Sequence, residues 1–273
     1  MAEYVAGLIS VIMGIYNCAE TLPSAIESIK AQTYTNWEII MCDDGSSDDT
    51  FAVASEYIDK WPQQVHVIRN ETNKGLNHTL NRCLKLCRGE FVARMDGDDL
   101  CDPKRFEIEI AELQSNGEID FVSTDMNFFD EEGTFGKIFH PDRPEPKDFL
   151  KENPFCHAPC MVRKSAYDDV GGYSEDKRLL RVEDYHLWIK MYMAGHKGIN
   201  IHQTLYMMRD DRNAYSRRKF RYRLNEAHVR MIAVKGFRMP FWNVIYVLKP
   251  ILVGLLPGTL YDTLHRRKLS TGE

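Results

Sequence analysis

The stretch EFVARMDGDD, residues 90–99, decides the fold class of this 273-residue chain. Its first part, EFVARM, is typical of a short buried strand, and the acidic turn DGDD ends that strand. The segment PKRFEIEIAELQS (103–115) then shows helical periodicity and opens with Pro103, which suits the first turn of a helix. A buried strand, a polar turn and a helix form the repeating unit of α/β folds.

The same alternation of strand and helix extends in both directions from this unit. Apolar runs predict strands at 8–13, 37–42, 65–70 and 119–129, and helical patterns predict helices at 21–32, after 50 as far as about 61, and at 75–87. Thr21 is expected to cap the first of these helices. The alternation predicts βαβ units and a Rossmann-like, mostly parallel sheet with helices on both faces.

Beyond residue 133 the pattern changes. A Pro-rich loop is expected at 140–148, and the segment 160–173 predicts a strand, a short helix and a Gly-Gly turn. EDYHLWIKMYMAG (183–195) is typical of an amphipathic helix, and a strand is expected at 196–209. A helical region rich in basic and apolar residues follows. We therefore divide the chain into an α/β domain, residues 1–210, and a helical extension, residues 211–273.

The net charge of −5 hides a strong asymmetry. Residues 212–268 contain 13 Lys and Arg against two acids, a local net charge of +11 that leaves about −16 for the rest. Such a division predicts that the extension faces an anionic surface and that the acidic part gathers a cation.

Cysteine spacing and the N-terminus both predict a cytoplasmic protein. Cys83 and Cys87, like Cys156 and Cys160, are four residues apart, which raises the alternative of a zinc site. The first pair lies on an apolar helical stripe, and no histidine lies within the last turn of that helix, so we expect the seven cysteines to be reduced, buried thiols. The first 14 residues lack the basic start and long apolar core of a signal peptide.

Three polar motifs follow predicted strands, and the carboxyl ends of parallel strands meet at one edge of a sheet. These motifs are Tyr16–Asn17, Asp43–Asp44–Gly45–Ser46 and Asp96–Gly97–Asp98–Asp99. Carboxylates that converge on one crevice repel one another unless a cation or hydrogen-bond donors compensate. The DGDD turn can present two carboxylates to Mg²⁺ or Mn²⁺, which keep open positions for phosphate oxygens. The alternative is a solvated acidic turn that caps the following helix, but the DDGS motif at another strand end favours the metal.

The order SVIMGIYN (10–17), SIKAQTYTNWEIIMCDDGSSDDT (28–50), NKGLNHTLN (73–81) and GEFVARMDGDD (89–99) resembles the family 2 glycosyltransferases, which are inverting enzymes with the GT-A fold. The resemblance covers about residues 8–210. It implies that residues 1–210 bind a nucleotide sugar and carry the catalytic site. It also implies a bacterial polysaccharide-biosynthesis role and a UDP-sugar as the donor.

The resemblance assigns the donor side of the site residue by residue. It implies that Tyr16, beside Asn17, packs against the nucleobase and that Asp44 accepts a hydrogen bond from it. Lys74 and Gly75 would lie along the nucleotide. Taken singly, Tyr16 is also typical of a strand-end aromatic and Lys74 of a solvated loop charge.

The metal and the diphosphate involve three further residues. Asp96 would approach the ribose or the metal, and Asp98 would hold the Mn²⁺ or Mg²⁺ ion that bridges the diphosphate. Arg209 could stabilise the same diphosphate, or it could be a plain surface arginine.

The acceptor side involves the segment RVEDYHLW (181–188), which matches the family's Glu-Asp motif. A helix N-terminus favours an ionised carboxylate, so Asp184 is expected to be the general base that takes a proton from the acceptor hydroxyl. Glu183 would orient the acceptor or the donor sugar, and it is the alternative base. His157, with Gly171–Tyr173, is expected to shape the sugar pocket. The QxxRW motif of processive synthases is absent, which favours transfer of a single sugar.

The extension predicts attachment to a membrane surface. Its apolar runs FWNVIYVL (241–248) and ILVGLL (251–256) are shorter than the ~20 residues of a spanning helix. Together with the basic clusters 217–223 and 265–268, they suit a bilayer interface, where a lipid-linked oligosaccharide acceptor would lie. The alternatives are a helical cap on the catalytic domain or an oligomer contact. No nucleic-acid motif is present, and we expect no nucleic-acid partner.

Three other functions fit the sequence less well than the transferase. A glycosidase also uses two carboxylates but needs no metal-binding strand edge. A nucleotidyltransferase of the same fold would have a Gly-rich loop with Lys or Arg after the first strand, where this chain has GIYNCAE. A non-catalytic nucleotide-sugar-binding protein would have lost Asp98 or Asp184, and both are present.

Overall fold

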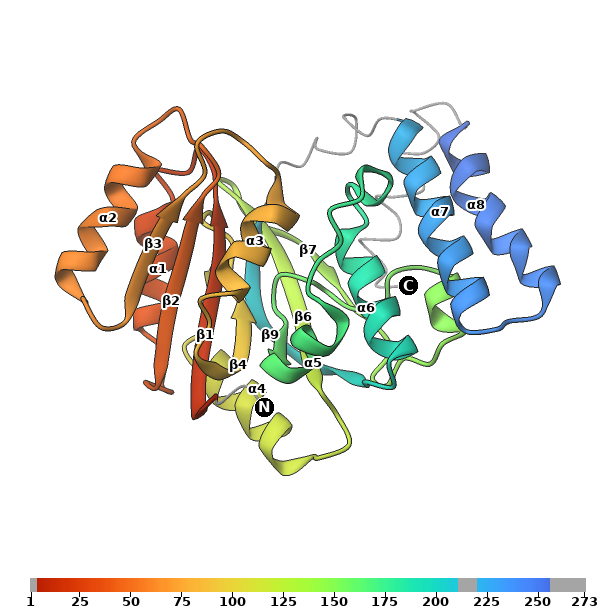
Figure 1. Ribbon diagram of the computed structural model, residues 1–273, viewed down its shortest axis with the longest axis horizontal. Coiled ribbons are helices and arrows are strands. Elements are labelled where there is room, and N and C mark those ends of the chain that lie inside the picture. Colours follow the sequence, from red (N-terminus) through yellow and green to blue (C-terminus); the bar gives the residue numbers. More distant parts are fainter. Residues whose placement is uncertain (1–3, 211–219, 256–273) are drawn as a thin grey trace.

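The structure is a computed structural model that describes residues 4–210 and 220–255 (Figure 1). The strands are β1 (Val5–Ile15), β2 (Trp37–Asp43), β3 (Val65–Arg69), β4 (Gly89–Arg94), β5 (Leu100–Cys101), β6 (Phe121–Asp130), β7 (Gly133–Ile138), β8 (Met161–Arg163) and β9 (Gly198–Arg209). The α-helices are α1 (Leu22–Lys30), α2 (Thr50–Lys60), α3 (Leu76–Leu84), α4 (Arg105–Ser115), α5 (Lys164–Val170), α6 (Glu183–Met193), α7 (Phe220–Gly236) and α8 (Val244–Gly254). Short 3₁₀ turns are η1 (Asp148–Leu150), η2 (Lys177–Leu179) and η4 (Phe241–Asn243).

One sheet runs through the molecule in the order β3-β2-β1-β4-β8-β6-β9-β5, and β7 pairs with β6. The block β3-β2-β1-β4 is parallel, as the alternation of strand and helix predicts. The parallel order is interrupted in the second half of the sheet, where β8 lies antiparallel between β4 and β6. The strands β5 and β7 are also antiparallel to their partners. The α/β class with a mostly parallel, helix-covered sheet is confirmed.

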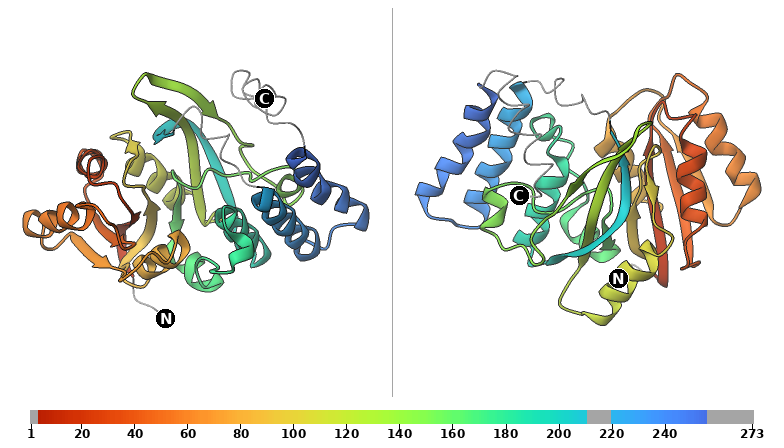
Figure 2. Two further views of the ribbon diagram at one scale, coloured as in Figure 1. Left: turned by 90° about the horizontal axis from the view of Figure 1, so that it is seen from above. Right: turned by 180° about the vertical axis from the view of Figure 1, so that it is seen from behind.

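Helices cover both faces of the sheet (Figure 2). The alternate side chains Ile9, Val11 and Met13 of β1 face one core, which contains residues of α1, α2 and α4. Ile12 of the same strand faces the other core, formed with α3, α5, α6 and α7. Because both faces are buried, the strands are almost continuously apolar rather than alternating.

The topology creates a crevice between β1 and β4. From β1 the chain moves outward through β2 and β3, and it then returns to β4 on the other side of β1. Ligands of open α/β sheets bind at such a switch point, beyond the carboxyl ends of the strands. The residues after β1 and the DGDD turn after β4 therefore meet at this crevice. Thr21 stands at the N-cap of α1, but its hydroxyl donates to the Gly97 carbonyl oxygen (2.9 Å) instead of capping the helix.

The helices α7 and α8 pack side by side at one end of the molecule (Figure 1). Asn225 of α7 donates to the Leu180 carbonyl oxygen at 2.8 Å, and Arg230 donates to the carbonyl oxygens of Leu150 at 2.9 Å and Tyr246 at 3.2 Å. The helix α8 continues through Pro250, so most of the first predicted apolar run and the start of the second belong to one helix.

The expected basic cluster 265–268 and the first part of the cluster 217–223 lie outside the described residues. Within residues 4–210 and 220–255, no helix combines the length and the apolar character needed to cross a bilayer.

Candidate active site

A pocket of about 400 Å³ lies at the β1–β4 crevice. Five residues predicted for the donor side line it: Tyr16, Asn17, Asp96, Asp98 and Arg209. Tyr16 is half exposed at the mouth, where its ring is available to a flat ligand. The sequence motifs of two separate strand ends and of the distant β9 thus meet at one place.

Close packing sets the shape of the turn in this pocket. A Cβ atom at Gly97 would lie 2.7 Å from the Cys18 sulfur and 3.2 Å from a methyl carbon of Ile15, so only glycine fits between Asp96 and Asp98. On the facing loop, Asn17 adopts a positive φ of 49°. Its side-chain oxygen accepts the Ser47 amide at 2.9 Å, which fixes the loop after β1 against the loop after β2.

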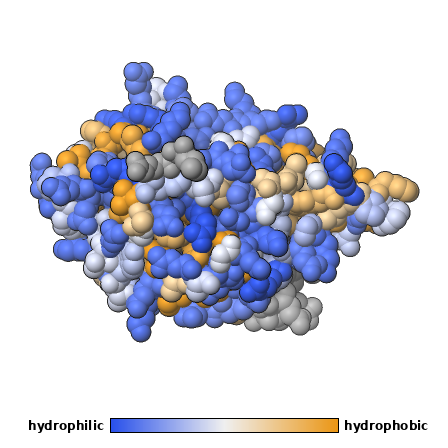
Figure 3. All heavy atoms as spheres, turned by 60° about the horizontal axis from the view of Figure 1, so that its bottom comes forward, coloured by the Kyte–Doolittle hydropathy of each residue, from blue (hydrophilic) through white to orange (hydrophobic). Residues whose placement is uncertain are grey.

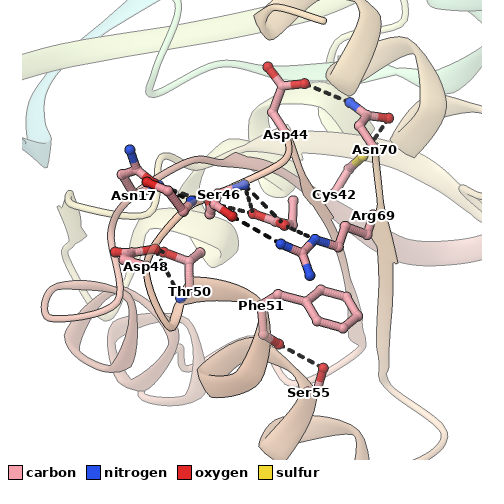
Figure 4. A network of polar contacts seen from close by, with 12 residues as sticks. Asn17, Cys42, Asp44, Ser46, Asp48, Thr50, Phe51, Ser55, Arg69 and Asn70 are labelled. Carbon is pink, nitrogen blue, oxygen red and sulfur yellow. Dashed lines mark hydrogen bonds and ion pairs between the residues drawn. The ribbon is translucent and has the colours of Figure 1, made fainter. Parts of the chain in front are cut away.

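Asp44 connects β2 to the NKG turn. Its Oδ1 accepts hydrogen bonds from the Lys74 amide (2.8 Å) and from Asn70 Nδ2 (2.7 Å), and its Oδ2 accepts one from the Gly75 amide (2.8 Å). Figure 4 shows the carboxylate directed toward Asn70 and away from Asn17. Asp44, Lys74 and Gly75 therefore come together as predicted, but they do so through backbone amides, and the Lys74 side chain is exposed.

Asp96 and Asp98 differ in their electrostatic surroundings. Both oxygens of Asp96 accept hydrogen bonds from Arg94 Nη2, at 2.7 and 2.8 Å. Burial and the nearby Asp96 carboxylate raise the pKa of Asp98 above its ordinary value, although Arg209 and Arg94 act in the opposite direction. A cation beside Asp98 would relieve this repulsion.

The third acid of the turn, Asp99, points into the protein. Its Oδ2 accepts a hydrogen bond from the Tyr206 hydroxyl (2.8 Å), and its Oδ1 accepts one from the Arg209 amide (2.8 Å). The Asp96 amide in turn donates to the Tyr206 oxygen at 3.2 Å. These contacts hold β9 against the acidic turn and carry Arg209 to the pocket, where its guanidinium stacks over Phe129.

A second pocket, of about 720 Å³, adjoins the first through Arg94 and contains the predicted acceptor-side residues. His157, Glu183 and Asp184 line it. Residues on both sides of the expected boundary at 210 contribute, because α7 supplies Tyr222, Arg223 and Glu226. The extension is thus part of the pocket wall.

Asp184 lies in the first turn of α6, and its Oδ2 accepts a hydrogen bond from Asn153 Nδ2 at 2.8 Å. Burial is the main cause that raises the pKa of Asp184 to about 6, and the neighbouring Glu183 carboxylate adds to the shift. A carboxylate with a pKa near 6 is ionised at neutral pH yet basic enough to accept a proton. Glu183 has a buried Oε2 with no hydrogen-bond partner among the described residues.

His157 is held as a neutral ring. Burial, with a smaller effect from the positive charge of Arg94, keeps the pKa of His157 well below its usual value. Its Nε2 lies 2.7 Å from the Tyr173 hydroxyl. The preceding Gly172 has a φ of +66°, and a Cβ there would lie 2.6 Å from the Asn81 side-chain oxygen, which explains the Gly-Gly turn.

The donor set of the first pocket fits a hard divalent cation. Mg²⁺ and Mn²⁺ sites that act on phosphates commonly use one or two protein carboxylates and take the remaining ligands from phosphate and water. Asp98 and Asp96 are a pair of this kind. Within the described part of the chain, no three His, Cys, Asp or Glu side chains gather into a complete metal cage. The pocket therefore fits a metal that arrives with a diphosphate.

Sequence reasoning missed several residues of the two pockets. Arg94 carried a signal, because a charge near the end of an apolar strand needs a buried partner. Asn153 and Tyr206 carried no such signal. Asn153 is 31 residues from its partner Asp184, and Tyr206 is 107 residues from its partner Asp99. The pocket residues of α7 lie in the extension, for which the main prediction was membrane attachment and a helical cap on the catalytic domain was an alternative.

A sheet with this switch-point crevice, an acidic turn at its edge and an adjoining carboxylate pocket defines a glycosyltransferase of the GT-A class. Residues 10–171 match the family described as Glycosyl transferase family 2. The chain belongs to this family, as its motifs predict.

Relatives and a solved structure agree with this assignment. The chain is 40% identical to EpsE of Bacillus subtilis, named as a glycosyltransferase, over 96% of this chain and 94% of that protein. It is 27% identical to the UDP-Glc:alpha-D-GlcNAc-diphosphoundecaprenol beta-1,3-glucosyltransferase WfgD of Escherichia coli, over 91% and 94%. The mannosyltransferase PcManGT of Pyrobaculum calidifontis, solved with GDP-Man and Mn²⁺, superposes with a TM-score of 0.63 at 19% identity, over 97% of this chain and 73% of that chain.

The hydrogen bonds of the Tyr206 hydroxyl should contribute to the stability of the folded protein. In Tyr206→Phe, the buried Asp99 Oδ2 and the Asp96 amide each lose a hydrogen bond. We expect the free energy of unfolding to fall by about 1–3 kcal/mol, measured by urea denaturation. Tyr57→Phe is the control, because the buried Tyr57 makes no hydrogen bond through its hydroxyl in the described part of the chain. Equal losses of unfolding free energy in the two variants would contradict a stabilising role for the hydrogen bonds of the Tyr206 hydroxyl.

Proposed function

We propose that the protein is an inverting, metal-dependent glycosyltransferase that moves one sugar from a UDP-sugar to a hydroxyl of a lipid-linked saccharide. The observation that carries this proposal is the adjacency of two different acidic pockets across Arg94. One has a pair of carboxylates suited to a metal-bound diphosphate. The other has a single carboxylate with a pKa of about 6.

The donor would occupy the smaller pocket. Tyr16 and Asn17 would meet the nucleobase, and Arg209 would meet the diphosphate. Asp44, Lys74 and Gly75 would border the nucleotide as a bonded unit rather than as three independent contacts. The name of the relative WfgD includes UDP-Glc, and this supports a UDP-sugar donor.

Asp98, assisted by Asp96, would hold the Mn²⁺ or Mg²⁺ ion, for which Mn²⁺ in the PcManGT structure is supporting evidence. When bound, such an ion neutralises the charge that develops on a departing diphosphate. Arg209 adds a fixed positive charge on the same side of the pocket.

The reaction is a single displacement. Asp184 accepts the proton of the acceptor hydroxyl while the hydroxyl oxygen forms a bond to the anomeric carbon. The bond between that carbon and the β-phosphate oxygen breaks, and the oxygen keeps the electron pair as UDP leaves. Glu183 would orient a sugar, and the neutral His157 would help to shape the pocket that receives it.

An apolar stripe along one side of the C-terminal helix supports a peripheral membrane location. Its side chains are 49–82% exposed and recur at intervals of four and three residues: Phe241, Ile245, Leu248, Leu252 and Leu255. Trp242 is also 65% exposed. Figure 3 shows hydrophobic side chains at the end of the molecule where α8 lies. We place this stripe on the cytoplasmic face of a membrane, and the free cysteines suit that reducing compartment.

Two isosteric variants should separate donor chemistry from base chemistry. Asp98→Asn should abolish both metal-dependent UDP-sugar hydrolysis and transfer, because it removes a charged metal ligand. Asp184→Asn should keep the affinity for UDP and Mn²⁺ in calorimetry but lower kcat for transfer by about 10²–10⁴-fold, because it removes the general base. Asp59→Asn, on the exposed side of α2, is the matched control.

Each result that contradicts these expectations would point to a different correction of the proposal. Substantial transfer by Asp184→Asn would move the base assignment to Glu183, which Glu183→Gln then tests. Donor binding without any turnover by the wild type would identify a non-catalytic nucleotide-sugar-binding protein.

The pH dependence of transfer should report Asp184. Only the ionised carboxylate accepts a proton, and its ionised fraction falls as the pH drops through the pKa of about 6. We therefore expect kcat/KM to rise with pH up to about 6 and to level off above it. Initial rates from pH 4.5 to 8.5 measure this limb. Rates that are already level at pH 5, as expected for an aspartate with an ordinary pKa near 4, would contradict the raised pKa of Asp184.

The membrane proposal can be tested on the apolar stripe. The double variant Phe241→Ser/Ile245→Ser should fold normally, since both side chains are exposed, but should lose cosedimentation with phosphatidylglycerol–phosphatidylcholine vesicles. Val5→Ser/Leu86→Ser removes two exposed apolar side chains elsewhere and should bind like the wild type. Unchanged vesicle binding would refute the membrane surface, and a change from dimer to monomer in ultracentrifugation would identify a subunit contact instead.

A further inference from the structure

Arg94 occupies an unusual position for a charged residue. It ends β4, between β1 and β8, and only 5% of its surface is exposed. Burial of a guanidinium in the middle of a sheet is unfavourable without charged or hydrogen-bonding compensation. The groups that Arg94 contacts therefore indicate the role of this buried charge.

On the donor side, Arg94 fixes Asp96. Its Nη2 donates to Oδ1 at 2.7 Å and to Oδ2 at 2.8 Å, so both oxygens of the carboxylate are held by one nitrogen. Asp96 lines the donor pocket beside Asp98. Groups that hold a metal-site carboxylate in this way determine which direction its remaining lone pairs face.

On the acceptor side, Arg94 lines the larger pocket together with Glu183 and Asp184. Its positive charge favours the ionised form of Asp184, in opposition to burial and to Glu183. The other charged or titratable groups that line this pocket are His157, Arg181, Asp210, Tyr222, Arg223 and Glu226. Arg94 lines this pocket and also contacts the donor pocket through Asp96.

A nearby arginine provides a comparison for a purely structural role. Arg105 is fully buried, and its Nε, Nη1 and Nη2 have partners in Glu109, Met95 and Cys160. It lines neither pocket. In Arg94, by contrast, Nε has no hydrogen-bond partner in the described part of the chain. Arg94 is thus the less well satisfied of the two, which is typical of a residue placed for function.

We propose that Arg94 is a positioning residue that couples the two pockets: its guanidinium aligns Asp96 in the donor pocket, and its positive charge lies in the wall of the acceptor pocket together with Asp184. This role rests on the proposed transferase function. It requires both the shape of the guanidinium, which brings Nη2 within reach of both Asp96 oxygens, and its charge, and these two properties can be separated by substitution.

Arg94→Lys keeps the positive charge but replaces the planar guanidinium with an ammonium group of different shape and reach. We expect the dissociation constant for Mn²⁺ in the presence of UDP, measured by calorimetry, to rise about 10-fold or more, as for other residues that orient metal ligands. The acid midpoint of kcat/KM should stay at its wild-type value. An unchanged Mn²⁺ affinity would refute the alignment of Asp96.

Arg94→Met removes the charge at similar length. We expect the acid midpoint of kcat/KM to move up by roughly one pH unit, because an opposite charge no longer favours the Asp184 carboxylate. A wild-type midpoint in this variant would refute the electrostatic role. Should Arg94→Met fail to fold, Arg94→Gln provides the same neutralisation with a polar side chain.

Arg105→Lys is the matched control for the loss of a buried guanidinium. It should lower the melting temperature yet leave both the Mn²⁺ affinity and the acid midpoint at their wild-type values. Equal changes in Arg105→Lys and Arg94→Lys would assign both residues to general structural support. A wild type that binds Mn²⁺ and UDP but transfers no sugar would refute the proposed function, while the binding measurements would still test Arg94.

Discussion

The buried carboxylate of Asp99 holds the two halves of the catalytic region together. It follows β4 in the first half of the chain, and both of its hydrogen-bond donors, the Tyr206 hydroxyl and the Arg209 amide, belong to β9 in the second half. Burial and the neighbouring acids raise its pKa well above the ordinary range, which shows how unfavourable this position is for a charge. The two hydrogen bonds offset that cost. Without them, neither the acidic turn nor Arg209 would have a fixed place at the crevice.

Most of the acidic residues at the strand ends serve structure rather than chemistry. Asp43 pairs with Arg69 at 2.9 Å, Asp44 accepts the amides of the NKG turn, and Asp99 faces inward. Of the DGDD turn, Asp96 and Asp98 line the donor pocket. This division explains how a fold tolerates so many acids at one edge: backbone amides and arginines neutralise those that a ligand does not need.

The sequence predicted the local features of this fold and missed those that depend on distant pairing. Periodicity located the strands β1 to β4 and the helix α6, because burial repeats along each of them. The strand β5 has only two residues and exists through its pairing with β9, so no local pattern could indicate it. The strand predicted within residues 160–173 is β8, but its antiparallel place between β4 and β6 depends on distant pairing. A motif likewise placed Asp44 at a strand end but could not give the direction of its carboxylate, which hydrogen bonds from a separate loop determine.

The path from the apolar stripe to Asp184 consists of packed, hydrogen-bonded elements. Arg230 of α7 bonds to the Tyr246 carbonyl oxygen of α8, and Asn225 bonds to Leu180, four residues before Asp184. The same helix α7 lines the acceptor pocket with Tyr222 and its neighbours. A surface that docks on a bilayer through α8 would therefore have a defined orientation relative to Asp184, the proposed general base. An acceptor anchored in that bilayer would therefore be partly aligned before it binds. A freely diffusing saccharide would have to lose more entropy to reach the same alignment.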